Sequence, residues 1–314
     1  MLDPDPRYLR AFVAVVEAGG LARAGSRLNL SQPTLSRQIQ ALERSLGVRL
    51  FHRTRRGAQL TSQGEDLLAR SRRLLADLHS LRERARALEG GRAGVLRVGA
   101  TPQMIERLLA RFLPSFSRRH PGVEVHLVED GGASLPGRLE HGQVDLAVTV
   151  AGDPRFGQRV LAPPIYVLAV LSRTHRLKPT GGLEISELSE LPLLLLRRDF
   201  GSRHWFDAAC QVANIRPRVL LESGAPHTLM ALARAGYGVA VLPSTVEIPR
   251  GNLRIVPLTL RGVPVGGWIA LAWDPRRFLP PYAEQFVTEL VGHARHAHPN
   301  RGVVRRLPRV PAPR

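Results

Sequence analysis

Hydrogen-bonding side chains gather between residues 32 and 44, where amide, hydroxyl and guanidinium groups recur every few positions. Such groups pair with base edges and phosphates when a helix carries them into the major groove of duplex DNA. The cluster comprises Gln32, Thr34, Ser36, Arg37, Gln40 and Arg44, with Pro33 between the first two. We therefore predict a DNA-binding surface here, with all of these residues except Pro33 and Arg44 reading bases.

The pattern around this cluster predicts the helix that carries it. Apolar residues recur at helical period on the opposite face, at Leu35, Ile39, Leu42 and Leu46. Ser31 can accept hydrogen bonds from the free amides of the first turn. Pro33 fits that turn, because its missing N–H costs nothing there. Gly47 is expected to end the helix.

Two shorter segments before this helix complete a helix-turn-helix. Helices are predicted over 7–18 and 21–28, and the recognition helix follows them after a tight turn. An amphipathic helix with arginines on its outer face can also be a solvated surface helix, which is the alternative interpretation. The basic hairpin that follows in the sequence favours DNA binding over this alternative.

That hairpin is predicted from short strands over 48–51 and 58–60, whose tip is rich in arginine. The tip carries Arg53, Arg55 and Arg56. Guanidinium groups suit the minor groove of DNA, whose negative potential attracts cations. We therefore expect a winged helix-turn-helix in which these three arginines contact DNA.

Residues 62 to 89 predict one long polar helix with a narrow apolar seam. The seam positions alternate at intervals of four and three, the heptad spacing of coiled coils. They are Leu67, Ser71, Leu74, Leu78, Leu81, Ala85 and Leu88, and Ser62 with Glu65 fits a capping box at the helix start. A seam this narrow cannot bury the helix in a globular core, so we expect dimerisation through its leucines. The alternative is a single helix packed on its own domain.

Beyond a glycine-rich hinge at 90–94, short apolar runs alternate with amphipathic stretches. Strands are predicted at 96–98, 123–128, 146–148, 166–171, 193–196, 219–221, 239–242 and 269–272. Helices are predicted at 105–116, 205–212 and 228–235. This alternation indicates βαβ units, parallel sheets and an α/β fold.

Polar residues follow several of these strands at points where a helix begins. In open α/β sheets such points bind ligands, because helix N-termini offer free amides and the positive end of the helix dipole. The candidates are Thr101, Gln103, Thr149, Ser202 and His227. Amides and hydroxyls favour a small anion, most simply a carboxylate. The alternative at each position is a capping or turn residue without a ligand, and His227 fits a surface histidine better than a ligand contact.

Catalytic constellations are missing from the sequence. It contains no G-x-S-x-G elbow, no H-E-x-x-H pair, no phosphate-binding loop and no complete G-x-G-x-x-G. We therefore predict no enzyme, no cofactor and no metal site; His293, His296 and His298 have no acidic or cysteine neighbours. The single cysteine, Cys210, rules out an intrachain disulfide, and we expect a buried core residue rather than a redox sensor.

The charge of the chain is concentrated at its two ends. The 314 residues carry a formal net charge of +19, of which residues 1–92 hold +8 and residues 293–314 hold +6. The segment between them is nearly balanced, as expected if DNA meets one end of the protein. A Pro/Arg-rich tail at 294–314 predicts disorder. No signal peptide or bilayer-spanning run is present, so we expect a cytoplasmic protein without membrane contact.

The segment SQPTLSRQIQALERSLGVRLFHRT, which begins at Ser31, resembles the N-terminal domain of the LysR-type transcriptional regulators. The likeness follows that family's layout over about residues 5 to 293. It implies a winged helix-turn-helix domain at 1–61, a linker helix at 62–89 and an effector-binding domain at 95–293. The effector-binding domain would be a two-lobed α/β domain similar to periplasmic binding proteins, with lobe I at 95–164 and 266–293 and lobe II at 165–265. The five candidate ligand residues would then line the cleft between the lobes.

The resemblance also implies partners, namely duplex DNA, a small-molecule effector, RNA polymerase, and copies of the chain in a homodimer or homotetramer. Two positions depart from the family pattern: Gly20 stands where Ser or Thr is common, and Gly25 where Ala is common. A glycine inside a helix costs about 1 kcal/mol relative to alanine, so we expect a soft second helix. Two competing interpretations are an architectural DNA binder with an unliganded scaffold and an α/β enzyme fused to a DNA-binding head. The missing catalytic groups disfavour the second.

Overall fold

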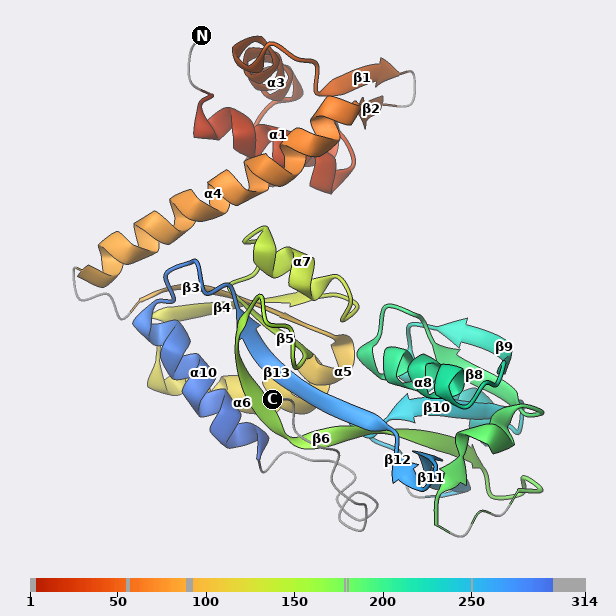
Figure 1. Cartoon of the computed structure of the whole chain (residues 1–314). Coiled ribbons are helices and arrows are strands. Elements are labelled where there is room, and N and C mark those ends of the chain that lie inside the picture. Colours follow the sequence, from red (N-terminus) through yellow and green to blue (C-terminus); the bar gives the residue numbers. More distant parts are fainter. Residues whose placement is uncertain are drawn as a thin grey trace. The chain divides into compact units, whose positions relative to one another are not determined.

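The computed structural model describes residues 4–54, 57–88, 93–177, 179, 181–249 and 251–295. The chain divides into two compact units, the first comprising residues 1–90 with 140–143 and the second the remainder (Figure 1). Several predicted features lie outside the described residues: Arg55 and Arg56 at the wing tip, His296 and His298, most of the hinge, and the tail from 296 onward. Within the described residues, no helix combines the length and apolar character needed to cross a membrane.

The first unit is a winged helix-turn-helix followed by a long helix. Its elements are α1 (Pro6–Ala18), α2 (Leu21–Leu28), α3 (Gln32–Leu46), β1 (Phe51–Thr54), β2 (Gly57–Leu60) and α4 (Ser62–Leu88). Strands β1 and β2 pair antiparallel, with Phe51 opposite Leu60. The predicted order of helices and wing strands is confirmed.

The first wing strand begins at Phe51, and the prediction of a strand over 48–51 was wrong for its first three residues. The amides of Leu50 and Phe51 donate to the Glu43 carboxylate at 2.8 and 3.3 Å. Because a side chain of α3 already satisfies these amides, this segment joins α3 to the wing without a strand partner. A hydrogen bond between a helix side chain and amides further along the chain leaves no periodic pattern in the sequence, so the pattern did not predict it.

The core of this unit forms from one face each of α1 and α3. Leu35 and Leu42 of α3 are fully buried against Phe12 of α1, as the apolar stripe predicted. Phe12 also meets Phe51 of the wing edge-to-face, with ring centroids 5.5 Å apart. This packing fixes the orientation of α3 and leaves its polar face directed away from the core.

Several helices of this unit begin beside a side chain that accepts a hydrogen bond from an amide of the first turn. Asp5 accepts from the Arg7 amide at 2.7 Å, and Ser31 accepts from the Thr34 amide at 3.4 Å. At the start of α4 the prediction of a capping box at Ser62 was wrong, because the Thr61 hydroxyl accepts from the Gly64 amide at 2.9 Å. A β-carbon on Gly64 would collide with the Leu50 carbonyl, so glycine is needed for this close approach.

The two glycines of the second helix have structural roles that the sequence did not reveal. Gly20 precedes α2 with φ +150°, a conformation that residues with a side chain rarely adopt. Gly25 is buried, and a β-carbon there would lie 2.7 Å from the Leu30 carbonyl oxygen. Gly20 therefore serves the turn between α1 and α2, and Gly25 allows the close approach of α2 to the segment that precedes α3. The softness of the second helix stays an expectation.

The second unit contains two lobes that share continuous strands. Its strands are β3 (Gly94–Ala100), β4 (Val123–Glu129), β5 (Leu146–Val150), β6 (Gly157–Ser172), β7 (Leu183–Glu184), β8 (Pro192–Leu196), β9 (Arg218–Ser223), β10 (Val239–Pro243), β11 (Leu253–Leu260), β12 (Val263–Pro264) and β13 (Gly266–Trp273). Its helices are α5 (Pro102–Met104), the π-helical turn Ile105–Leu109, α6 (Ala110–Arg119), α7 (Leu135–Glu140), the 3-10 turn Ile185–Leu188, α8 (Gly201–Val212), α9 (Pro226–Arg234) and α10 (Pro281–Ala294). Each predicted strand is present, while β7, β11 and β12 were not predicted.

Strand β6 passes from one lobe to the other (Figure 1). Its first part pairs with β13 up to Tyr166, and from Val167 onward it pairs with β10 and β11. The strand order across the unit is β4-β3-β5-β13-β6-β10-β8-β9. The two lobes are thus joined by backbone hydrogen bonds as well as by chain connections.

The prediction of parallel sheets was wrong for the centre of the unit. Parallel pairing joins β3 to β4 and β5, β8 to β9 and β10, and β11 to β7. Strand β6 pairs antiparallel with β13, β10 and β11, and β13 pairs antiparallel with β5. The chain leaves lobe I along β6 and returns to it along β13. These two strands therefore run in opposite directions side by side.

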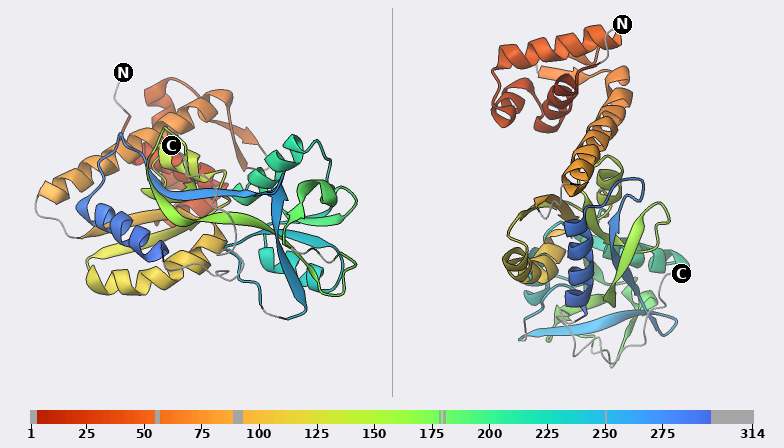
Figure 2. Two further views of the ribbon diagram at one scale, coloured as in Figure 1. Left: turned by 60° about the horizontal axis from the view of Figure 1, so that its bottom comes forward. Right: turned by 90° about the vertical axis from the view of Figure 1, so that its left-hand side faces the viewer.

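Helices cover both faces of each lobe. In lobe I, Phe112 of α6 and Phe286 of α10 pack edge-to-face at 5.1 Å on one side of the sheet, where the two helices lie side by side (Figure 2). In lobe II, residues of β10 alternate between two cores. Val241 faces the core of α8, while Leu242 faces the core of α9. This alternation follows from the two-residue period of a strand buried on both faces.

The helix predicted over 105–116 begins earlier and is interrupted by a π-helical turn. It starts at Pro102, and the turn spans Ile105–Leu109. Pro114 lies inside the continuation α6, where it has no N–H to donate. Turns of this kind often occur at functional sites, and this one begins two residues after Gln103.

Candidate functional site

The exposed face of α3 carries the predicted DNA-binding residues. Gln32, Pro33 and Arg37 are exposed, while Thr34, Ser36 and Gln40 are half-buried. The Thr34 hydroxyl hydrogen-bonds the Ser31 hydroxyl at 2.8 Å, so part of its capacity is used in the cap. The structure brings these side chains to one surface and leaves their base-reading role a prediction.

A shallow hollow lies at the C-terminal end of α3. It is lined by Gln40, Glu43, Arg44, Gly47, Val48 and Arg49. Arg49 extends the basic surface beyond the helix, and sequence reasoning missed it because it was assigned to the wing strand. Of the three predicted wing arginines, Arg53 lies in β1 with its backbone opposite Ala58, and Arg55 and Arg56 lie outside the described residues.

The leucine seam of α4 is divided between two environments. Leu67 packs partly against the core of the first unit, beside Leu75. Leu74 and Leu81 are 50% and 66% exposed, and Leu78 is half-buried. The surroundings of the Leu88 side chain lie outside what is described. The start of the helix packs on its own domain, as the alternative interpretation expected, and the exposed leucines that follow leave dimerisation a prediction.

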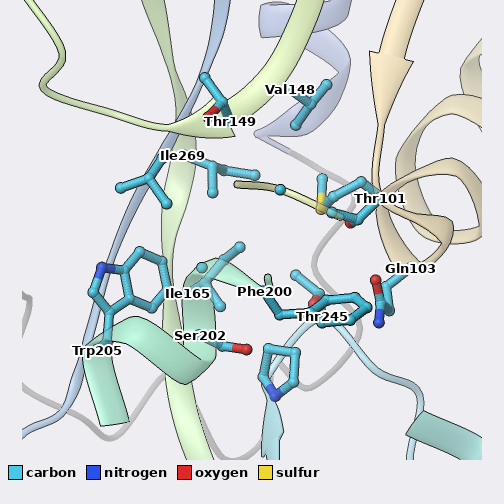
Figure 3. Close-up of a pocket in the computed structure, with 15 residues that line it drawn as sticks. Thr101, Gln103, Val148, Thr149, Ile165, Phe200, Ser202, Trp205, Thr245 and Ile269 are labelled. Carbon is cyan, nitrogen blue, oxygen red and sulfur yellow. The ribbon is translucent and has the colours of Figure 1, made fainter. Parts of the chain in front are cut away.

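A cavity of about 60 Å³ lies between the two lobes of the second unit. Lobe I contributes the end of β3, the start of α5 and part of β5, while lobe II contributes the start of α8 and the end of β10. The space corresponds to a few water molecules. In Figure 3, Thr101 and Gln103 lie toward one side, and Trp205 and Ile269 toward the other.

Four of the five predicted ligand residues line this cavity, although they are far apart in the sequence. They are Thr101, Gln103, Thr149 and Ser202. His227 is not among the lining residues: its side chain is 61% exposed and its Nε2 lies 3.6 Å from Glu106 Oε2. The position of His227 agrees with the surface-histidine alternative.

One buried polar group at the cavity, the side-chain amide nitrogen of Gln103, has no partner among the described residues. The residue as a whole is 5% exposed. Neither Thr101, before α5, nor Phe200, before α8, makes a side-chain cap hydrogen bond. The amides of Gly201 and Ser202 begin α8 and therefore have no acceptor within the helix. The arrangement offers donors to an acceptor that the chain itself does not supply.

The rest of the cavity wall is apolar, and sequence reasoning missed most of it. Ile165 and Ile269 come from β6 and β13, and Trp205 comes from α8. Trp205 lies over Gly267, where any β-carbon would collide with the indole ring. Thr245 also lines the cavity just after β10, and the rule used for the other strand ends would have found it.

Charged side chains near the cavity are engaged with one another. Arg203 is 4% exposed and donates to Asp207, Glu222 and the Leu196 carbonyl, each at 2.7 Å. Burial opposes its ionisation, but the hydrogen bonds to the two carboxylates outweigh burial and raise the pKa of Arg203. Arg107, on the π-helical turn, pairs with Glu247 of the other lobe.

Cys210 lies in the core between α8 and its sheet. It is 3% exposed, which confirms the predicted burial. Burial, with a smaller effect from Asp207, raises the pKa of the thiol to about 11. At neutral pH only about one molecule in ten thousand would then carry the reactive thiolate.

Comparison with known families gives matches to both units. Residues 6–65 match the family described as bacterial regulatory helix-turn-helix protein, lysR family. Residues 89–295 match the family described as LysR substrate binding domain. The two matches follow the order seen in the structure and leave only short segments uncovered.

Individual proteins are similar over nearly the whole chain. The uncharacterized HTH-type transcriptional regulator YnfL of Escherichia coli (strain K12) is 30% identical over 301 residues, covering 94% of this chain and all of that protein. Full-length CbnR in complex with its target DNA has a TM-score of 0.61 at 26% identity, covering 93% of this chain and 99% of that one. A hydrogen peroxide-bound cysteine-to-serine mutant of OxyR from Corynebacterium glutamicum has a TM-score of 0.57 at 27% identity, covering 94% and 93%.

Proposed function

The chain belongs to the LysR family of transcriptional regulators, and on that premise we propose that a small carboxylate, bound between its lobes, controls how it engages DNA. The protein is a DNA-binding transcriptional regulator with an effector-binding domain, and not an enzyme. The observation that supports a carboxylate is the interlobe cavity, where Gln103 presents a buried donor without a partner among the described residues and no acidic side chain is among the described residues that line it.

The anion would be held by donors from both lobes. Gln103 supplies a buried N–H₂ group, and Thr101 and Ser202 supply hydroxyls. Helix α8 spans twelve residues, and its N-terminal amides carry the positive end of the helix dipole. A carboxylate oxygen can accept from such groups without a cationic partner. Binding would favour the arrangement of lobes in which both sets of donors meet the ligand, which is a population shift.

DNA would be read by the exposed face of α3. Arg37 is exposed and its backbone is held by a capped, well-packed helix, so it can reach base edges without rearrangement of the domain. Gln32, Ser36 and Gln40 lie on the same surface, and wing arginines would neutralise phosphates nearby. CbnR, to which this chain is similar, was solved bound to its target DNA.

Two copies of the chain would associate through α4. The exposed Leu74 and Leu81 are spaced by seven residues, which places them on one face of the helix. We propose a dimer, or a tetramer built from dimers, that presents two α3 helices to DNA and from there acts on RNA polymerase. Sedimentation of a monomer at micromolar concentration would contradict this assembly.

Peroxide sensing is not proposed, although a relative was solved with peroxide bound. Oxidation by peroxide needs an accessible thiolate. Cys210 is the only cysteine, it is buried, and its pKa is raised to about 11. These features favour a structural role for the thiol.

The DNA-binding part of the proposal is tested on the intergenic region upstream of the gene. Footprinting at physiological ionic strength should reveal a protected site, bound in preference to random competitor DNA. Arg37→Ala should weaken specific binding by about 1–3 kcal/mol if Arg37 contacts a base, whereas Arg55→Ala should mainly lower the salt dependence. Arg218→Ala is the matched control, since this exposed arginine lies on β9 of the other unit. If Arg37→Ala and Arg218→Ala weakened specific DNA binding equally, the assignment of α3 as the base-reading helix would be contradicted.

The effector part is tested by titration calorimetry of the full-length protein with small carboxylates. Thr101→Ala should weaken binding about three- to tenfold, since one hydrogen bond to an ion contributes on the order of 1 kcal/mol. His227→Ala should leave binding unchanged because His227 does not line the cavity. Identical binding by wild type and Thr101→Ala would place the ligand elsewhere.

A further inference from the structure

We propose that an ion pair between the lobes, Arg107 with Glu247, holds the two lobes of the free protein in the arrangement in which the effector site is assembled. Arg107 is thus a positioning residue, which acts on the site without lining the cavity. This inference rests on the proposed effector site between the lobes. The hold on the lobes can nevertheless be measured without any ligand.

The two partners come from different lobes and differ in burial. Arg107 lies on the π-helical turn Ile105–Leu109 of lobe I, and Glu247 lies in lobe II beyond the end of β10. Arg107 is 7% exposed, and Glu247 is its only ion-pair partner among the described residues. A buried cation without a carboxylate is strongly unfavourable. The arrangement of lobes that brings Glu247 to Arg107 is therefore stabilised.

Short segments join both partners to the wall of the cavity. Gln103 lies four residues before Arg107, in the helical segment that runs from α5 into the π-helical turn. Thr245 lies two residues before Glu247. Gln103 and Thr245 both line the cavity (Figure 3). An opening of the lobes that breaks the ion pair must therefore also separate these two parts of the cavity wall.

A backbone hydrogen bond between the lobes gives a direct measure of their separation. The Ala133 amide of lobe I donates to the Asp199 carbonyl of lobe II at 2.9 Å. The neighbouring Gly132 lines the cavity, as does Gly201. Separation of the lobes breaks this hydrogen bond, and hydrogen exchange of the Ala133 amide then becomes faster.

A second ion pair between the lobes supplies a matched control. Glu106, on the same π-helical turn, has its Oε2 3.6 Å from Nε2 of His227. The side chains of Glu106 and Glu247 are similarly exposed, at 59% and 67%, but His227 is 61% exposed whereas Arg107 is buried. Exposed ion pairs contribute little, because water screens them. The two glutamates thus differ mainly in the burial of the partner that each one holds.

Hydrogen exchange of the full-length protein without ligand, followed by mass spectrometry, tests the hold on the lobes. Glu247→Ala should speed exchange of the Ala133 amide by about fivefold or more, whereas Glu106→Ala should change it by less than about twofold. Exchange of Val98, buried in β3, should stay the same in both variants, which separates lobe opening from general destabilisation. Arg107→Met should match Glu247→Ala, and the double variant should exchange less than about twofold faster than either, because both changes remove one interaction.

Calorimetry with acetate, the simplest organic carboxylate probe, then connects the ion pair to the effector site. Only molecules with the lobes together offer a ligand the donors of both lobes. The apparent dissociation constant therefore rises as the fraction of such molecules falls. Acetate should bind Glu247→Ala about threefold or more weakly than wild type, and Glu106→Ala as tightly as wild type.

The two measurements fail in different ways. Unchanged exchange of Ala133 in Glu247→Ala, an equal increase in Glu106→Ala, or effects that multiply in the double variant would overturn the inference whatever acetate does. Faster exchange with unchanged acetate affinity would overturn the positioning role of Arg107. Failure of acetate to bind the wild-type protein would instead contradict the proposed carboxylate site, while the exchange rates still decide whether the ion pair holds the lobes together.

Discussion

The two units of this protein treat their polar groups in opposite ways. In the DNA-binding unit, Asp5, Ser31 and Thr61 accept hydrogen bonds from the first turns of α1, α3 and α4, and α2 begins at Gly20 without a side-chain cap. At the interlobe cavity, the helices that begin near Thr101 and Phe200 have no side-chain cap. The first unit is complete as a folded scaffold, while the second leaves donors that a ligand can satisfy.

This contrast corresponds to two kinds of recognition. In the proposed function, the α3 surface would read DNA, a large polyanion, with exposed side chains, so its backbone must be rigid before DNA arrives. The cavity would enclose a small molecule, and its hydrogen bonds would be completed only on binding. Unsatisfied buried donors cost stability, and they persist where function uses them.

The largest expected effect is on the free energy of unfolding, when a buried arginine of one unit is compared with an exposed arginine of the other. Arg203→Met should lower the free energy of unfolding by about 2–3 kcal/mol, because it leaves Asp207 and Glu222 without their buried partner. This is below the usual cost of a broken buried pair since both carboxylates remain partly exposed. Arg37→Ala, on the exposed face of α3, should change it by less than about 0.5 kcal/mol. Urea denaturation measures both, and equal effects would remove the distinction between the two arginines.

A second prediction concerns whether replacing a glycine with alanine raises or lowers the stability of the protein. Gly25→Ala should destabilise the DNA-binding unit by about 1–3 kcal/mol, because the new methyl group meets the Leu30 carbonyl at 2.7 Å. Gly292→Ala is the control: Gly292 lies in α10 with open space around it, so alanine should stabilise by about 0.5–1 kcal/mol. Thermal unfolding compares the two. If Gly25→Ala stabilised the protein, the soft-helix expectation would be supported.

A third prediction tests the caps directly. Ser31→Ala should cost about 1 kcal/mol of stability, because it removes the acceptor for the Thr34 amide. Thr101→Ala should change the stability of the free protein by less than about 0.5 kcal/mol, because Thr101 makes no cap hydrogen bond. With ligand present, Thr101→Ala should reduce the ligand-induced rise in melting temperature. A loss of about 1 kcal/mol in the free Thr101→Ala protein would mean that its hydroxyl caps the helix after all.

The smallest expected effect concerns Cys210. Its raised pKa keeps the thiol neutral up to about pH 11 in the folded protein, whereas an unfolded cysteine ionises near 8.5. The unfolded state therefore loses its proton first, and this thiol lowers stability only as pH rises above about 8.5. At pH 8, alkylation by iodoacetamide should be at least a hundredfold slower in the native protein than in urea, as followed by mass spectrometry. Rapid native labelling would reopen a redox role.

Local patterns in the sequence predicted many of the helices and strands. The stripe through Leu35 and Leu42, the cap at Ser31 and the order of strands and helices were predicted from periods of two and 3.6 residues, and the structure confirms them. The wing boundary was misplaced because Glu43 satisfies the amides of Leu50 and Phe51 from seven or more residues away. Periodicity does not encode such a contact.

The candidate site was predictable only in part. Thr101, Gln103, Thr149 and Ser202 were found because ligand-binding residues follow the ends of strands, and the family resemblance placed those ends at one cleft. Ile165, Ile269 and Trp205 could not be found this way, since a buried aliphatic residue in a strand looks the same whether it faces a core or a cavity. His227 satisfied the rule and yet lies at the surface beside Glu106.

The sequence by itself determined the recognition helix, its cap, its apolar face and its family, because these depend on residues within one or two turns of each other. Only the tertiary structure decided that β6 passes through both lobes and pairs antiparallel with β13 in the first, that Gly25 serves a close turn, and that the Gln103 amide nitrogen is buried without a partner among the described residues. The physical reason is that hydrogen-bond satisfaction and steric fit depend on neighbours brought from distant parts of the chain, which local composition does not specify.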